Sequence, residues 1–423
     1  MSPWSSRSFS RESDAALEGL SAAQQGNLRF LEKSLHELWN LGQNMLLCWS
    51  PTASGITVLM APHNFLARFS ASLNDCDPVD RLEALNGSFI RKLIAGRRQM
   101  EAREFEGTAR RLDLTAMPIK LPIPIVGDES VLAATEAMVR RYSISYVENR
   151  AVLLFDIVDF SLFTPFEQAS QLNSLSWSLN DAYSKLMRHN INVEFARTTT
   201  GDGFYIWNRD PNPAGNLHLF HLMLLVVANN AIARMQATPN TVPAIRSGFH
   251  VGSHYEFSQA EGLNPTMSSY IVGEVTIELA RILASARSGQ ILVGDFVTRV
   301  PTSMREGAYI LGVDTVRFVE RIRKNLDLLR GLELSGEKVK SIHCYLTGET
   351  GPSGGETIRH FRITDKHGRS RNAYNVRVNI RTDSGRSLMM GTQAGGAGRE
   401  PEPAPVAGRR HDNYTGYRPA RRK

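Results

Sequence analysis

The sequence contains only three cysteines, and no two of them stand at the C-x-x-C spacing of a zinc or redox pair. This scarcity excludes a disulfide-stapled scaffold and is typical of a reducing compartment. The N-terminus lacks the apolar core of a signal peptide, and no uncharged apolar run approaches the ~20 residues that span a bilayer. We therefore expect a cytoplasmic protein with no membrane partner, in which the longest apolar run, 217–235, forms a buried helix.

Positive charge is also less dominant over most of the chain than the formal net charge of +7 indicates. Part of the excess lies in the last 25 residues, as Arg399, Arg409, Arg410, Arg418, Arg421, Arg422 and Lys423. Because this segment reads as a solvated tail, the remainder is closer to neutral, and we expect no nucleic-acid partner. The content of 42% hydrophobic and 22% charged residues is typical of globular domains, and 423 residues predict two or three of them.

Composition and hydrophobic periodicity divide the chain into five segments. Residues 1–117 are predicted to be mainly helical, and residues 118–145 a proline-containing linker with a short helix. Residues 146–348 alternate between strand and helix patterns, which predicts an α/β (α+β) sandwich with a mixed sheet. Residues 357–391 read as a small β-rich module, and residues 392–423 as a disordered basic tail.

Two acidic residues stand at strand ends of the central segment. Asp156 ends the buried strand RAVLLFDIV, and Asp202 occupies the turn Gly201-Asp202-Gly203 of a predicted hairpin. If the hairpin returns beside the first strand, the two carboxylates converge. Such oxygen ligands suit magnesium or manganese, which act on phosphates. The alternative is that Asp156 caps a helix and Asp202 only forms a turn.

The order of four motifs favours the first interpretation. FDIVDFS, TTTGDGFYI, IRSGFHVGS and YIVGEVTIELARILASARSGQILV closely resemble successive stretches of the class III nucleotide cyclase catalytic domain. The resemblance covers residues 146–348, about half of the chain. It implies attack of a ribose 3′-hydroxyl on the α-phosphorus of a nucleoside triphosphate, with loss of pyrophosphate.

The resemblance also assigns roles to individual residues. Asp156 and Asp202 would be ligands of two Mn²⁺ or Mg²⁺ ions per site, with the carbonyl of Ile157 completing one shell. Backbone groups from Ile157 to Phe160 would bind the triphosphate. Arg281 matches the arginine that stabilises the pentacovalent phosphate.

A terminal-phosphate contact and a partner are implied as well. Lys338 lies near the family's terminal-phosphate lysine. In this family each site is built between two subunits, so a single cyclase domain in the chain implies a head-to-tail homodimer.

Two departures from the family pattern concern the base. Thr198 stands where the family has an adenine-reading lysine, and Tyr270 replaces its small polar partner. A smaller pocket with hydroxyl donors suits a smaller base, because unmatched buried polar groups penalise a purine. Arg197 and Tyr146 are further candidates for base contacts.

This pattern resembles the pyrimidine cyclases of bacterial antiphage (Pycsar) systems. The resemblance implies conversion of UTP to cyclic UMP and signalling to a separate effector, with CTP as the alternative substrate. The segment 357–391 is similar to a small sensor domain of such cyclases.

Other departures leave two further hypotheses open. Ile277 replaces the family's transition-state asparagine, and Asp159 adds a negative charge to the phosphate-binding turn. These residues motivate a non-catalytic nucleotide-binding regulator as one alternative. An adenylate or guanylate cyclase with unusual base contacts is the other.

Overall fold

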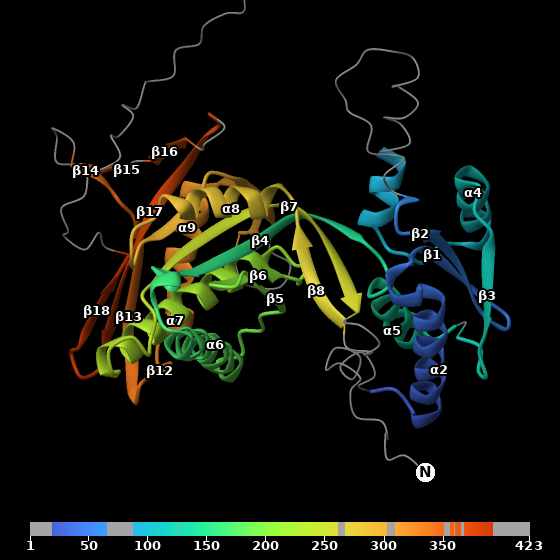
Figure 1. The fold of residues 1–423 in the computed structure, drawn as a ribbon, viewed down its shortest axis with the longest axis horizontal. Helices are drawn as coiled ribbons and strands as arrows, with labels where there is room; N and C mark the ends of the chain where they lie inside the picture. Colours follow the sequence, from blue (N-terminus) through green and yellow to red (C-terminus); the bar gives the residue numbers. More distant parts are fainter. Residues whose placement is uncertain are drawn as a thin grey trace, which may run out of the picture.

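The protein has a mixed α/β fold, as predicted, with a smaller N-terminal body beside a large central sheet (Figure 1). The computed structural model describes residues 19–65, 88–125, 127–260, 267–302, 309–350, 356–358, 360–364 and 368–391. The tail predicted at 392–423 lies outside the described residues.

The N-terminal body is built on a three-stranded antiparallel sheet of order β1-β2-β3. Its elements are α2 (Ala22–Trp39), η1 (Asn40–Gly42), β1 (Asn44–Thr52), β2 (Gly55–Pro62), a helical segment at 88–95, α4 (Ala102–Leu112), β3 (Ala116–Lys120) and α5 (Glu129–Arg140). Helices α2 and α5 cover one face of this sheet, and the 88–95 helix and α4 pack on the other.

Helices occupy more of the described part of 1–117 than strands do, but the prediction of a mainly helical region misses the β1–β2 hairpin. Pro51 and Gly55 look like helix breakers, but they flank the turn of a β-hairpin whose two strands are buried. The segment predicted as a linker with a short helix, 118–145, begins inside β3, which pairs with β2. The short helix predicted within that segment is present as α5.

The central sheet has eleven strands, with the main order β12-β13-β17-β9-β7-β4-β6-β5. The sheet is mixed because β7 pairs parallel with β9, whereas β7 pairs antiparallel with β4 and β8. Its strands are β4 (Ser145–Ile157), β5 (Phe195–Thr199), β6 (Gly203–Asn208), β7 (Ile245–Ala260), β8 (Met267–Val272), β9 (Ile291–Gly294), β12 (Glu333–Leu334), β13 (Glu337–Leu346), β16 (His360–Thr364), β17 (Ser370–Thr382) and β18 (Ser387–Met390).

The remaining elements cover or flank this sheet. They are η3 (Phe160–Leu162), α6 (Pro165–Arg188), α7 (Ala214–Gln236), α8 (Glu274–Ala284), β10 (Val297–Pro301), β11 (Ile310–Asp314), α9 (Thr315–Asn325), η4 (Leu326–Leu329), β14 (Gly348–Thr350) and β15 (Glu356–Ile358).

Alternation of side chains along β4 separates the two faces of the sheet. Leu153 and Phe155 pack with α6, α7 and α9, whereas Val152 and Leu154 pack with α8. Among the described residues, α7 is the one helix long and apolar enough to cross a membrane, but 83% of its apolar window is buried. It is the core helix that the sequence predicts.

The segment predicted as a separate C-terminal module belongs instead to the central sheet. Strand β17 lies between β13 and β9 and pairs with both. Its inward side chains Val376, Val378 and Ile380 are fully buried in the main core. Sequence patterns predict strands but not which strands pair. The segment 357–391 is therefore predicted to be β-rich, but the position of β17 between β13 and β9 is not.

Strand β17 should therefore be required for folding of the central sheet. We expect a chain truncated after Leu346 to accumulate in insoluble form or to lose cooperative unfolding, because β9 and β13 would expose unpaired edges. Soluble yield and thermal melting followed by circular dichroism measure this. A chain ending at Gly391 is the matched control and should melt like the full chain. Cooperative melting of the shorter chain at the full-length temperature would contradict the inserted topology.

Candidate functional site

The structure brings Asp156 and Asp202 to the same edge of the central sheet. Asp156 is the penultimate residue of β4 and pairs in register with Gly203, the first residue of β6. The backbone N–H of Ile157 donates to the carbonyl of Asp202 at 2.9 Å, which fastens the β5–β6 turn to the end of β4. The convergence expected from the two strand ends is present.

Two glycines make this close approach possible. Gly201 has φ +98°, a conformation that side chains with a Cβ rarely adopt. A Cβ on Gly203 would lie 1.9 Å from the carbonyl oxygen of Phe155. The sequence Gly-Asp-Gly is thus what allows an acidic turn to press against the neighbouring strand.

Arg246 completes the cluster, and the sequence interpretation did not assign it a role. Asp156 pairs in register with Arg246 of β7, and the Nε of Arg246 donates to its Oδ2 at 2.5 Å. The side chain of Asp156 is 17% exposed and that of Arg246 is 27% exposed. Arg246 also donates to the carbonyl of Ala286, directly after α8. Its position two residues before Gly248, on the strand beside β4, is the signal that would have found it.

Burial and like charge act together on Asp156. Its pKa is raised above the usual aspartate value, first by burial and also by the negative charge of Asp202, while the hydrogen bond and charge of Arg246 oppose the shift. The repulsion between the two carboxylates is the electrostatic condition that a bound cation relieves.

Removing Arg246 should move the pH dependence of the site. Arg246 lowers the pKa of Asp156, so Arg246→Gln is expected to raise it and to shift the acidic limb of activity to higher pH. The limb moves to higher pH because activity that needs the ionised Asp156 carboxylate is lost as the pH falls through the pKa of that carboxyl. The measurement is the pH–rate profile of the pyrophosphate release that the motif resemblance implies. Arg299→Gln, at an exposed arginine on β10, is the control and should leave the limb in place. An unmoved limb in Arg246→Gln would show that the pair does not tune the site.

The donor set fits a hard divalent cation that also binds its substrate. Among the described residues, no group of three or more histidine, cysteine, aspartate or glutamate side chains gathers as a metal site. A complete protein cage, as for structural zinc, is therefore not formed there. Two carboxylates beside backbone carbonyls suit Mg²⁺ or Mn²⁺, which keep water ligands and take the rest from phosphates.

The backbone expected to cradle phosphates is only partly available. The N–H groups of Ile157 and Val158 already donate to the carbonyls of Asp202 and Ala244. After Asp159, at φ +57°, the chain forms a single 3-10 turn, η3. α6 begins five residues later, and its first turn is capped by Thr164 and Glu167. Any phosphate contact thus falls to the turn at Asp159 and Phe160.

The candidate base-reading residues divide between the two faces of the sheet. Thr198 pairs with Tyr205 and shares the α8 face with Asp156 by alternation. Arg197 points to the opposite face, where it donates to the hydroxyl of Ser176 on α6 and lies over Phe204. Within one chain the structure therefore does not bring Arg197 to the carboxylates.

Tyr205 is a second residue that the sequence interpretation missed. Its hydroxyl donates to the carbonyl of Thr276 at 2.9 Å, which ties β6 to α8. Burial, together with the charge of Asp156, raises the pKa of Tyr205 to about 12. The phenol therefore stays protonated and holds α8 over the carboxylate end of the sheet.

Tyr270 lies on the β7–β8 arm, defined here as residues 255–260 and 267–272. It pairs in register with Phe257, and the two rings stack with centroids 5.7 Å apart and an interplanar angle of 19°. Strand β8 runs close to β5, which carries Thr198, and leads through Gly273 into α8. Tyr146 packs away from the carboxylates, against Tyr255 and the N-terminal body.

The other predicted residues lie on separate elements. Arg281 and the 52% exposed Ile277 are on α8, one turn apart. Lys338 is exposed on β13, and β17, β9 and β7 separate that strand from β4. Within one chain Lys338 is therefore not beside Asp156.

Comparisons with known proteins found similarity only among solved structures. No family model matches, and no curated protein matches. The chain is similar to the adenylyl cyclase CyaB from P. aeruginosa (13% identity, 55% of this chain and 95% of that chain, TM-score 0.32). It is also similar to the guanylyl cyclase Cya2 (13%, 55% and 92%, TM-score 0.30) and to the guanylate cyclase domain of RhGC from Catenaria anguillulae in complex with GTP (14%, 40% and 96%, TM-score 0.29). These are likenesses of fold at low identity, and the activity proposed below rests on the residues of the site.

Proposed function

We propose that this protein is a nucleotide cyclase that uses Mn²⁺ or Mg²⁺ and converts UTP to 3′,5′-cyclic UMP and pyrophosphate. The observation that carries the proposal is the meeting of Asp156 and Asp202 at one sheet edge, close enough for each charge to affect the other. The motif order of residues 146–348 supports the reaction class. The proposed role of the product is to signal to a separate effector in antiphage defence.

Different residues of the site would have different roles in the reaction. Asp156 and Asp202 would hold two cations against the triphosphate, and bound cations of this kind lower the pKa of the attacking 3′-hydroxyl and neutralise phosphate charge. Arg246 is the counter-charge of Asp156 in the structure and would turn to the phosphates when cations replace it. Arg281 would stabilise the charge that develops on the α-phosphate as pyrophosphate leaves.

A head-to-tail homodimer would complete the site, with Arg281 and Tyr270 facing the carboxylates of the other copy. The surface beside Asp156 supports this. Leu162 and Phe166, which follow the site loop directly, are 80% and 81% exposed. Large apolar side chains gathered beside a site are typical of a contact surface.

Base selection is proposed to depend on Thr198 and Tyr270, from the neighbouring strands β5 and β8. Neither side chain carries the charge that a purine-reading lysine and aspartate would supply. The double variant Thr198→Lys/Tyr270→Asp is therefore expected to gain turnover of ATP relative to UTP, by about tenfold or more.

The ratio of the two cyclic products, measured by mass spectrometry with both triphosphates present, tests this. Thr364→Lys, at an exposed threonine on β16, is the control and should leave the ratio unchanged. An unchanged ratio in the double variant would show that these positions do not read the base.

A second function has one observation in its favour. The side chain of Ile277 offers no hydrogen-bond donor and is 52% exposed on α8. A nucleotide-binding regulator without turnover would share the carboxylates and bind UTP with Mn²⁺. Nucleotide binding without pyrophosphate release would favour it over the cyclase.

A further inference from the structure

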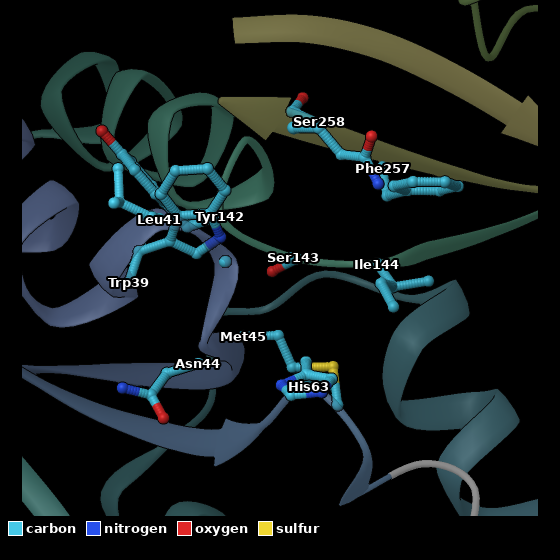
Figure 2. Close-up of a pocket in the computed structure, with 12 residues that line it drawn as sticks. Trp39, Leu41, Asn44, Met45, His63, Tyr142, Ser143, Ile144, Phe257 and Ser258 are labelled. Atoms are coloured by element: carbon cyan, nitrogen blue, oxygen red, sulfur yellow. The ribbon is translucent and has the colours of Figure 1, made fainter. Parts of the chain in front are cut away.

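A cavity of about 350 Å³ lies where the N-terminal body meets the β7–β8 arm (Figure 2). It is lined by Trp39, Leu41, Gly42, Asn44, Met45, His63, Tyr142, Ser143, Ile144, Phe257, Ser258 and Gln259. Its volume lies within the range of roughly 300 to 1,000 Å³ that small-molecule sites occupy. The carboxylates are elsewhere, at the far end of β4.

The lining defines the class of ligand. None of the twelve residues is aspartate, glutamate, lysine or arginine. Trp39 and Tyr142 meet edge to face, with ring centroids 5.9 Å apart, and form an aromatic corner. Figure 2 shows these two rings on one side of the cavity and Phe257 on the arm across from them. His63 is the one lining side chain that can ionise near neutral pH, so the lining favours an uncharged ligand, and a planar one gains contacts with the aromatic rings.

Polar groups at the rim add the hydrogen-bonding part of the recognition. Gln259 carries a side-chain amide with a donor and an acceptor side by side, whereas the Nδ2 of Asn44 already donates to the carbonyl of Leu38 and leaves only its amide oxygen for a ligand. Such amides match the edges of nitrogen heterocycles. Aromatic walls, amide edges and the absence of charge together fit a neutral heterocycle the size of a nucleobase or nucleoside.

The backbone beside the cavity is in a conformation typical of ligand-binding segments. Asn40 and Leu41 both have positive φ, 48° and 57°, although neither is glycine. Leu41 leaves its apolar side chain 52% exposed at the cavity. Consecutive residues in this region persist only where the surroundings enforce it, and they are frequent at ligand clamps.

We propose that this cavity binds an uncharged planar nitrogen heterocycle, a nucleobase or nucleoside, and that its occupancy regulates the cyclase. Phe257 is the link, because it lines the cavity and stacks on Tyr270 of the same arm. A ligand that presses on Phe257 therefore acts on the strand that leads to α8. This regulatory part rests on the proposed cyclase function, whereas the binding part does not.

Calorimetry on the full chain carrying Asp202→Asn tests the binding, with adenosine, uridine, AMP and UMP as probes. Adenosine or uridine is expected to bind at one site, and the corresponding monophosphate about tenfold more weakly. Leu41→Trp should block the cavity and weaken nucleoside binding by about tenfold or more. Leu328→Trp, at another half-exposed leucine, is the matched control. Absence of nucleoside binding, equal binding of the monophosphates, or binding unaffected by Leu41→Trp would overturn the assignment.

Turnover by the otherwise unchanged chain tests the regulation. The nucleoside that binds should change the rate of pyrophosphate release, and Leu41→Trp should remove that effect. Binding with an unchanged rate would overturn the link through Phe257. If the protein binds the nucleoside but forms no cyclic nucleotide under any condition, the proposed function fails and the cavity assignment stands.

Discussion

Asp202→Asn is expected to reduce formation of the cyclic nucleotide by ~10²–10³-fold or more, while leaving the fold intact. The amide keeps the size of the carboxylate and the backbone contact from Ile157 to the carbonyl of residue 202, so the turn should persist. It removes one negative charge from the pair that would hold the cations. The measurement is the initial rate of cyclic nucleotide formation with Mn²⁺ present.

The matched control is Asp383→Asn, which makes the same change in the exposed turn between β17 and β18. This control should retain the rate of the unchanged protein. Thermal melting of both variants separates chemistry from folding. A rate for Asp202→Asn within about twofold of the unchanged protein would rule out Asp202 as a cation ligand.

Arg98→Met should lower the free energy of unfolding of the N-terminal body by about 3–5 kcal/mol. Arg98 is 1% exposed, and its guanidinium donates to four backbone carbonyls and one hydroxyl. The acceptors are the carbonyls of Leu93, Ile94, Gly96 and Ile144 and the hydroxyl of Ser145. Methionine fills much of the space but leaves these buried acceptors without a donor.

The same arginine connects the N-terminal body to the strand that carries Asp156. Two of its hydrogen bonds reach Ile144 and Ser145, where β4 begins. Chemical denaturation followed by tryptophan fluorescence measures the loss, because the buried Trp49 donates to Glu136 beside Arg98. Arg97→Met, at the adjacent exposed arginine, should change stability by less than about 0.5 kcal/mol. Equal stability of the two variants would contradict a structural role for the buried cation.

The site carboxylates could be predicted because local sequence encodes them. A short buried strand ending in Asp156 and a glycine-flanked turn holding Asp202 are both visible in the chain, and antiparallel pairing then brings them together. Arg246 stands in the motif IRSGFHVGS, but its pairing with Asp156 depends on the register between β4 and β7, which the motif alone does not give. Which of Arg197 and Thr198 faces the side of Asp156 also depends on register, since a shift of one residue along a strand reverses the face.

The N-terminal hairpin and β17 show the same limit at a larger scale. The strands β1 and β2 are nearly continuous apolar runs, which cannot be distinguished from buried helix by periodicity alone. Strand β17 was visible as a strand, but its position between β9 and β13 depends on pairings distant in sequence. Individual strands were thus easier to predict from the sequence than the pairing of those strands in the sheet.

Product identification with all four nucleoside triphosphates tests the central claim most directly. Purified full-length protein is incubated with Mn²⁺ and each triphosphate in turn, and the products are identified by mass spectrometry. We expect cyclic UMP with release of pyrophosphate, well above any cyclic AMP or cyclic GMP, and a yield from the Asp202→Asn variant that is lower by ~10²–10³-fold or more. Absence of every cyclic nucleotide, or an equal yield from that variant, would contradict it.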